Sequence, residues 1–424
     1  MFNNYVVDIH AIQSLPPSNL NRDETGSPKT ATFGNVRRAR VSSQAWKAAM
    51  RKWFKENLDL DNPGIRTKHV PQMILEEILN RGIGGMTEKQ SVIDMKDIMS
   101  VILPKKKDKN KQSVAENTDK ITGITTYQTD ALFMVSRRQI QRVVDIKYDP
   151  NLNDKERVKQ IQNALNEDQA MDTSLFGRMV ADAPNINVDA GVQVAHALGV
   201  TKAIPEFDFY TAMDDERDRV DHSGSSMMGT IEFSSSVLYR YADLSLSQLL
   251  GNLGGNVPAT IFAVQEFLRA FIKSMPSGKQ NTFAAHTLPD AVIVTIRPGR
   301  PVSYVEAFEN PIEGGSPTIK AIDTLVDYAE VQKKSYGLEE VATYVVAVRG
   351  ADRLSELGEV VGLQELISKV GDTIRDDVFH YVPDDGSQQD EDGVSVDAQE
   401  PPVEKVSEED CKAATQDAAV IEEV

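Results

Sequence analysis

The sequence has a single cysteine, Cys411, among its 424 residues. This excludes a disulfide within the chain and a metal site built from several thiolates. No apolar stretch approaches the roughly 18 residues needed to span a membrane as a helix, and the apolar stretch at 291–296 is only long enough for a strand. The first residues also lack the basic and apolar regions of a secretory signal. We therefore expect a cytoplasmic protein without membrane partners.

Catalytic motifs are absent as well. The six histidines show no metal-ligand spacing such as His-Glu-x-x-His, and the chain has neither a P-loop nor a Gly-x-Ser-x-Gly nucleophile motif. The strongest catalytic candidate is Asp23, a carboxylate in a basic loop. A single carboxylate makes a poor metal site, and pairing with Arg22 or Arg37 is an equally simple role for it. We expect no enzymatic activity and no cofactor.

The acidic net charge of −18 is unevenly distributed. Residues 383–424 hold fourteen acidic residues and two lysines, a net charge of −12, which leaves about −6 for the first 382 residues. By contrast, residues 20–55 hold nine lysines and arginines against Asp23 and Glu24, a net charge of +7. Phosphate binding depends on local potential rather than on total charge. The pattern favours a phosphate-binding surface near the amino end, although a solvated basic face is the usual alternative.

Local patterns define the structure around this basic segment. Residues 4–12 are typical of a buried strand, residues 16–35 of a long loop, and residues 36–41 of a short basic strand. A helix is expected to begin at Ser42 or Ser43, because either hydroxyl can cap it. Its apolar stripe consists of Trp46, Ala49, Met50, Trp53 and Phe54.

The opposite face of this helix carries Gln44, Lys47, Arg51 and Lys55. Free backbone N–H groups at a helix N-terminus attract anions, and Ser42, Ser43 and Gln44 add neutral donors. We therefore predict a phosphate track along the loop, the strand and the helix.

The remaining chain alternates between helical and extended patterns. Residues 61–170 are mostly helical in pattern, and a second sheet-like region is expected to begin near Met171. Residues 199–229 lack a helical period and lead into a strand at 231–241. One face of that strand carries Ile231, Phe233, Val237, Tyr239 and Tyr241. Residues 383–424 are acidic and poor in aromatics, which predicts disorder.

Several motifs occur in an order that resembles one family. They are Leu20-Asn21-Arg22-Asp23, Phe33-Gly34, Arg37-Arg38-Ala39-Arg40-Val41-Ser42-Ser43-Gln44, Lys47-Ala48-Ala49-Met50-Arg51, Phe176-Gly177-Arg178-Met179, Ala195-His196-Ala197, Phe209-Tyr210-Thr211-Ala212, Gly229-Thr230, Phe233-Ser234-Ser235, Tyr239-Arg240-Tyr241 and Gly278-Lys279-Gln280. Their succession over residues 4–300 is similar to that of the CasC family, the backbone subunits of the type I-E CRISPR Cascade complex. The acidic tail departs from the family pattern.

This resemblance implies an α+β fold with an RRM-like (ferredoxin-like) palm, an inserted helical fingers domain and a thumb hairpin. The implied boundaries are palm at 1–60, 171–198 and 230–382, fingers at 61–170, thumb at 199–229, and a disordered acidic tail at 383–424. The implied function is non-catalytic binding of CRISPR guide RNA (crRNA) in antiviral defence. The implied partners are further copies of the chain, the large, small and guide-processing endonuclease subunits, and target DNA paired to the guide.

The resemblance also implies the RNA-binding residues. They are Arg22, Lys29, Ser42, Gln44, Lys47 and Arg51, together with Arg38, Arg178, Met179, Met228 and Lys279 from the matched motifs. Lysine, arginine, serine and glutamine suit a surface that contacts phosphates and sugars regardless of sequence. Met179 and Met228 are expected to press on displaced bases, because a flexible apolar side chain can wedge between bases without choosing among them. Ordinary core packing is the alternative for both methionines.

Two other functions stay open at this point. Related backbone subunits of type III complexes cut target RNA with a divalent metal and a loop aspartate, and Asp23 occupies a comparable loop. The chain is alternatively a general single-strand RNA-binding protein, which would show no preference for guides that carry a repeat-derived handle.

Overall fold

The computed structural model describes residues 4–58, 63–82, 87–103, 114–180, 183–212 and 227–382. The tail predicted to be disordered, at 383–424, lies outside these ranges. The described residues form an α+β fold, as the sequence predicted, and its largest sheet has ten strands. No helix in the described ranges is long and apolar enough to cross a membrane.

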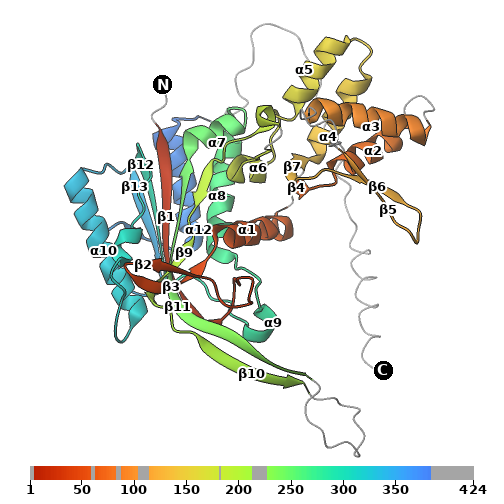
Figure 1. Ribbon diagram of the computed structural model, residues 1–424. Coiled ribbons are helices and arrows are strands. Elements are labelled where there is room, and N and C mark those ends of the chain that lie inside the picture. Colours follow the sequence, from red (N-terminus) through yellow and green to blue (C-terminus); the bar gives the residue numbers. More distant parts are fainter. Residues whose placement is uncertain are drawn as a thin grey trace, which may run out of the picture. The chain divides into compact units, whose positions relative to one another are not determined.

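The large sheet is antiparallel except for one pair (Figure 1). In spatial order its strands are β14 (Glu359–Val360), β13 (Ala342–Ala347), β12 (Ala291–Pro298), β1 (Tyr5–Ser18), β11 (Met227–Ser245), β9 (Ala197–Lys202), β3 (Val36–Val41) and β2 (Thr30–Phe33). Two further strands, β8 (Val192–Val194) and β10 (Glu206–Ala212), pair with β11. Only β13 and β14 run parallel.

Strand β1 lies between β11 and β12, and both of its faces are covered, which explains its apolar sequence. The predicted strand at 4–12 is confirmed, but β1 continues to Ser18. It passes Pro16 and Pro17 at a register shift between Leu15 and Ser18, where missing N–H groups are tolerated. The loop predicted at 16–35 therefore begins later, and it also contains β2.

One face of the sheet is covered by α1 (Ser43–Asn57), α6 (Met171–Phe176), α7 (Leu246–Asn252), α8 (Val257–Lys273) and α12 (Leu363–Thr373). The predicted start of α1 is confirmed, because the Ser42 hydroxyl accepts a hydrogen bond from the Ala45 N–H. Trp46, Met50 and Phe54 are buried against this face. The sheet-like region expected near Met171 instead opens with the short helix α6.

The opposite face is covered by α10 (Pro317–Tyr336), with η3 (Val305–Phe308) and α11 (Ala351–Leu354) nearby (Figure 1). Val237, Tyr239 and Tyr241 of β11 point into this second core, as their alternation predicted. Leu238 and Ala242 point into the first core. Strand β11 is therefore buried on both faces, like its neighbour β1 at the centre of the sheet.

A third core is formed by buried residues between Val70 and Ile186. Its helices are α2 (Val70–Arg81), α3 (Glu88–Ile102), α4 (Arg137–Tyr148) and α5 (Asp154–Ala164), and η2 (Pro184–Ile186) follows later. Two small sheets pair β4 (Gly64–Thr67) with β7 (Phe133–Ser136), and β5 (Ala115–Thr118) with β6 (Thr125–Gln128). The helical pattern is confirmed for this stretch, whereas the four short strands were not predicted.

The amino-terminal part of β11 forms an arm with β10. Pairing runs from Glu206 opposite Phe233 to Ala212 opposite Met227, and residues 213–226 lie outside the described ranges. From Ser234 onward the same strand pairs with β1. A single strand therefore belongs both to the arm and to the centre of the sheet.

Candidate nucleic-acid interface

The loop before α1 is tied to the start of that helix. The Ser42 N–H donates to Asn21 Oδ1 over 2.9 Å, and the Ser43 N–H donates to His196 Nδ1 over 3.1 Å. The Ala45 N–H bonds to Ser42. The N–H groups of Ser43 and Ala45 thus already have protein acceptors, so fewer helix N–H groups are free for an anion than the sequence predicted. The charged and polar side chains around the helix start are then the main source of attraction.

Asp23 organises the basic loop. Its Oδ1 accepts hydrogen bonds from the Thr25 N–H, the Thr25 hydroxyl and the Ser27 N–H. These donors hold the pKa of the Asp23 carboxyl below its usual value, with the Thr25 hydroxyl contributing most. Among the described residues Asp23 forms no ion pair with Arg22 or Arg37. Its observed contacts define a turn that keeps Arg22 exposed and Lys29 half-buried.

A cleft of about 540 Å³ lies along the outer face of α1. It is lined by Gln44, Lys47, Ala48, Arg51, Arg66, Leu132, Phe133, Met134, Phe176, Gly177, Arg178, Met179, Asn187, Val188, Asp189 and Ala190. The structure thereby brings the predicted helix face and the predicted Gly-Arg-Met motif together, although more than 120 positions separate them in the sequence.

Lys47 is a half-buried cation of the cleft for which the described residues supply no counter-charge. Partial burial lowers the pKa of its ammonium group. No carboxylate in the described ranges lies within ion-pair distance of it. A partly desolvated charge without a partner gains free energy from any anion that enters. Beside it Gln44 is exposed and contributes a neutral donor.

Arg51 is already engaged. Its guanidinium pairs with Asp172 of α6 at 3.5 Å, and Asp172 also accepts a hydrogen bond from the Gly64 N–H over 2.9 Å. Burial raises the pKa of Asp172, and Arg51 counteracts part of that shift. Arg51 therefore links α1 to α6 and β4 while it lines the cleft, and its role is structural as well as electrostatic.

The three residues of the Gly-Arg-Met motif, residues 177–179, have different structural roles. Gly177 has φ of +76°, and a Cβ there would lie 2.8 Å from the Val188 carbonyl oxygen, so the turn after α6 requires glycine. Arg178 points inward and donates to the carbonyls of Ile186, Met134 and Leu165. Met179 points outward and is 82% exposed. The core-packing alternative does not describe Met179.

Three of the predicted RNA contacts are buried: Ser42, whose hydroxyl caps α1, and the two arginines Arg38 and Arg178. Arg38 donates to the carbonyls of Gly199, Val200, Phe308 and Glu309. Their guanidinium donors are used inside the protein, so we do not retain either residue as a direct RNA contact. In the described ranges neither arginine has a carboxylate partner. Each therefore keeps its positive charge, and burial lowers the pKa of Arg178 to about 10.

The remaining predicted residues lie on other segments. Lys279 is half-buried and has φ of +52°, directly before α9 (Gln280–Phe283). Its neighbour Gly278 packs so closely on the Leu20 backbone that a Cβ would lie 2.1 Å from the Leu20 oxygen. This contact places Lys279 beside the basic loop. Met228 lies in the arm, opposite Thr211.

Two groups of residues were missed by the sequence reasoning. Phe207 and Phe209 of β10 are 67% and 63% exposed on one face of the arm. Their period-two spacing was the available signal. His196, which accepts the Ser43 N–H, occurs in one of the matched motifs, but its contact with α1 could not be predicted because it depends on strand pairing.

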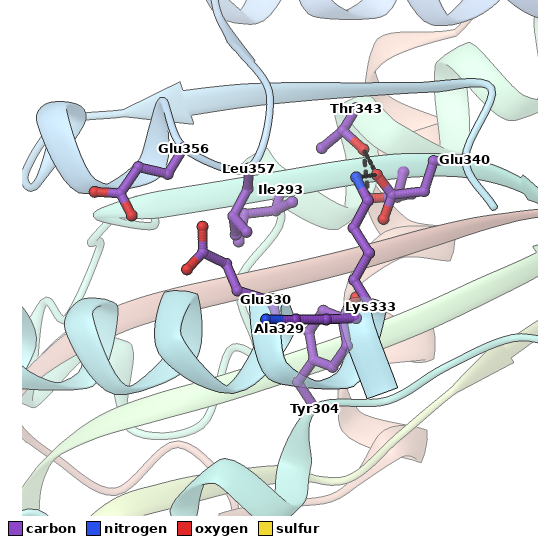
Figure 2. Close-up of a pocket in the computed structure, with 11 residues that line it drawn as sticks. Ile293, Tyr304, Ala329, Glu330, Lys333, Glu340, Thr343, Glu356 and Leu357 are labelled. Carbon is purple, nitrogen blue, oxygen red and sulfur yellow. Dashed lines mark hydrogen bonds and ion pairs between the residues drawn. The ribbon is translucent and has the colours of Figure 1, made fainter. Parts of the chain in front are cut away.

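A second cavity, of about 400 Å³, lies on the α10 face (Figure 2). Its lining includes Lys333 and Lys334, together with Glu330, Glu340 and Glu356. Lys333 forms an ion pair with Glu340 at 2.7 Å, and Glu340 also accepts a hydrogen bond from the Thr343 hydroxyl. The carboxylates outnumber the cations in this lining, so the cavity is not suited to a polyanion.

The chain is similar to chains of two solved CRISPR RNA-guided surveillance complexes. One solved structure is described as a CRISPR RNA-guided surveillance complex, pre-nicking. Its matching chain is 33% identical in sequence to this chain, the match covers 87% of this chain and 99% of that chain, and the TM-score is 0.74. A chain of a second CRISPR RNA-guided surveillance complex is 27% identical, with 86% and 99% covered and a TM-score of 0.63.

No curated protein matched the chain. The sequence model of the family described as CT1975-like protein, a Cas family, matches residues 7–369. These matches confirm the resemblance to the CasC family that the motifs indicated. The chain belongs to the CT1975-like family of Cas proteins.

Proposed function

We propose that this protein is the non-catalytic, crRNA-binding backbone subunit of a type I-E Cascade complex. The observation that carries the proposal is the cleft along α1. It combines an unpaired lysine, Lys47, with an exposed amide donor, Gln44, and an exposed methionine, Met179. The similarity to chains of CRISPR RNA-guided surveillance complexes supports the same function.

The proposed domain organisation follows from the order of the elements. An RRM-like, ferredoxin-like palm is supported by six elements that follow one another along the chain in the order β1–α1–β9–β11–α8–β12. Their strands lie side by side in the order β12–β1–β11–β9. Residues 61–170 enter between α1 and β9 as the fingers. The thumb expected at 199–229 would divide β9, which pairs within the large sheet, so we assign the thumb to the arm, residues 206–233. The palm then comprises residues 1–60, 171–205 and 234–382.

The RNA would be held by its backbone. Lys47, Gln44, Arg22, Lys29 and Lys279 are suited to phosphate and ribose oxygens, and such contacts carry no preference for sequence. Arg38 and Arg178 add positive potential from below the surface, because backbone carbonyls solvate their charges without neutralising them. The proposed affinity is electrostatic and should fall steeply with salt.

Base displacement is proposed for Met179. An exposed flexible thioether costs little to desolvate and packs against any base. The arm of β10 and β11, with Phe207 and Phe209 on one face, would contact the guide on a neighbouring copy of the chain. Assembly along the crRNA with large, small and endonuclease subunits would leave short segments free to pair with target DNA.

The proposal assigns Asp23 to loop structure rather than to hydrolysis. Its Oδ1 accepts three hydrogen bonds, which explains the residue without a metal. We expect the protein to bind RNA without cutting it when Mg²⁺ is present.

The test compares two charge reversals on one helix. Lys47→Glu places a negative charge in the cleft, and about a 100-fold loss of affinity for guide-length RNA is expected at 100 mM salt. Lys52→Glu is the matched control, because Lys52 is exposed, pairs with Glu56 and does not line the cleft. Arg51 is unsuitable for this test, since reversing it would also repel Asp172.

Binding is measured by fluorescence anisotropy with two unrelated guide sequences, after thermal melting shows that both variants fold. Equal affinities of Lys47→Glu and the parent protein would remove the proposal. A loss that depends on base sequence would contradict backbone recognition.

A further inference from the structure

His196 lies in the connection between β8 and β9, which is fixed on both sides. The Ala195 N–H donates to the Tyr241 carbonyl over 3.0 Å, and Ala197 pairs with Val41 at the end of β3. Because β3 leads directly into α1, this pairing brings His196 to the first residues of the helix. Its side chain is exposed to solvent.

The two donors that face His196 define its tautomer. The Ser43 N–H donates to Nδ1 over 3.1 Å, and the Arg40 guanidinium approaches the same nitrogen at 3.5 Å. A backbone N–H and a guanidinium can only donate. Nδ1 must therefore be the unprotonated nitrogen of a neutral ring, and Nε2 carries the hydrogen.

The Nε2–H group is available for a ligand. No acceptor for it lies in the described part of the chain, and it occupies the ring edge away from Ser43. Desolvation lowers the pKa of His196, and the nearby charges of Arg40 and Lys29 lower it further. The hydrogen bonds at Nδ1 thus leave an Nε2–H donor on a ring that lies near two cations.

We propose that His196 donates a hydrogen bond from Nε2 to an oxygen of the RNA backbone while its Nδ1 holds the start of α1. This assignment rests on the proposed function and adds a specific contact to it. The ligand is a phosphate or ribose oxygen, since both accept from a neutral N–H and neither depends on base identity.

Two isosteric replacements separate the two ring nitrogens. His196→Asn keeps an acceptor near the position of Nδ1 but removes the outer donor. His196→Gln keeps a donor near the position of Nε2 but removes the inner acceptor. If Nε2–H binds RNA, His196→Asn should bind guide RNA about tenfold more weakly than the parent. His196→Gln should stay within about threefold of the parent, provided that melting shows both to be folded.

The acceptor is identified with a 2′-deoxy strand of the same sequence. A ribose acceptor predicts that the parent and His196→Asn bind the deoxy strand equally. A phosphate acceptor predicts that the tenfold difference persists. Either pattern supports the inference.

Equal affinity of His196→Asn and the parent for guide RNA would overturn it, and so would a larger loss for His196→Gln than for His196→Asn. In both cases the Lys47→Glu result would still stand by itself. A parent protein that binds no guide RNA would overturn the inference and the proposed function together.

Discussion

The α1 cleft and the α10 cavity hold similar residues but have opposite electrostatic character. The α1 cleft contains Lys47 without a carboxylate partner in the described ranges, whereas Lys333 in the α10 cavity is paired with Glu340. Both lysines are long, flexible cations beside a hollow. The difference teaches that the balance of nearby carboxylates, rather than the presence of lysine, determines the charge of a cavity.

Buried arginines extend this contrast. Arg38 and Arg178 are solvated by backbone carbonyls, while Arg297 on the α10 face pairs with Asp8 at 3.0 Å. A charge solvated by dipoles remains a net charge, and a charge paired with a carboxylate does not. The positive charge at the α1 cleft therefore includes the buried Arg178 as well as cations at the surface.

The largest expected effect is on stability, at the base of the α1 cleft. Arg178→Met leaves several buried carbonyls without a donor, and we expect it to reduce the free energy of unfolding by about 3 kcal/mol. Urea denaturation measures this. Arg66→Met is the control, because Arg66 lines the same cleft but is exposed, and its replacement should cost less than about 0.5 kcal/mol. Equal costs would show that the carbonyl contacts of Arg178 contribute little.

The next largest expected effect is on RNA affinity, and it compares Lys47 of the α1 cleft with Lys333 of the α10 cavity. Lys47→Met should weaken RNA binding about tenfold and leave stability unchanged or slightly higher, because a partly desolvated charge is removed. Lys333→Met should leave RNA affinity unchanged. Anisotropy titrations and thermal melts of both variants check this. Similar losses of RNA affinity in the two variants would break the distinction between the cavities.

The smallest expected effect is a pH-dependent change in stability that arises from two buried aspartates, Asp8 and Asp243. Asp243 is buried directly opposite Asp8, and burial together with Asp8 raises its pKa to about 6. The folded state then binds a proton more readily than the unfolded state, so stability falls as the pH rises from about 4 to about 6. Asp243→Asn should stabilise the protein by about 1 kcal/mol above pH 6 and have little effect near pH 4.

Thermal melts across this pH range test the Asp243 prediction. Asp130→Asn, at an exposed aspartate, is the control and should show no such pH dependence. A pH-independent gain for Asp243→Asn would mean that packing, rather than ionisation, sets the difference.

The sequence predicted those features that depend on neighbouring residues. The strand at Val36–Val41, the Ser42 cap and the buried positions of Trp46 and Met50 all follow from local spacing and propensity, and the structure has them. The α+β class followed from the same patterns together with the resemblance.

Residues whose role depends on distant segments were not predictable in this way. Arg38 resembles any other basic surface residue until β9 and Phe308 supply its carbonyl acceptors. The Ser43 N–H seemed free until His196, 153 positions later, accepted it. The sequence therefore indicated that this part of the chain is basic. It could not show which of the basic side chains face solvent and which are buried.

Strand β11 also has a mechanical consequence. Its seven residues from Met227 to Phe233 pair with β10, and the next residues are already bonded to the central strand β1. At about 3.3 Å per residue this paired stretch spans roughly 20 Å. Since no loop interrupts the strand, a force on the outer end is transmitted to the middle of the sheet without a hinge. The reach of the arm beyond the sheet is therefore fixed by the number of residues that pair between β10 and β11.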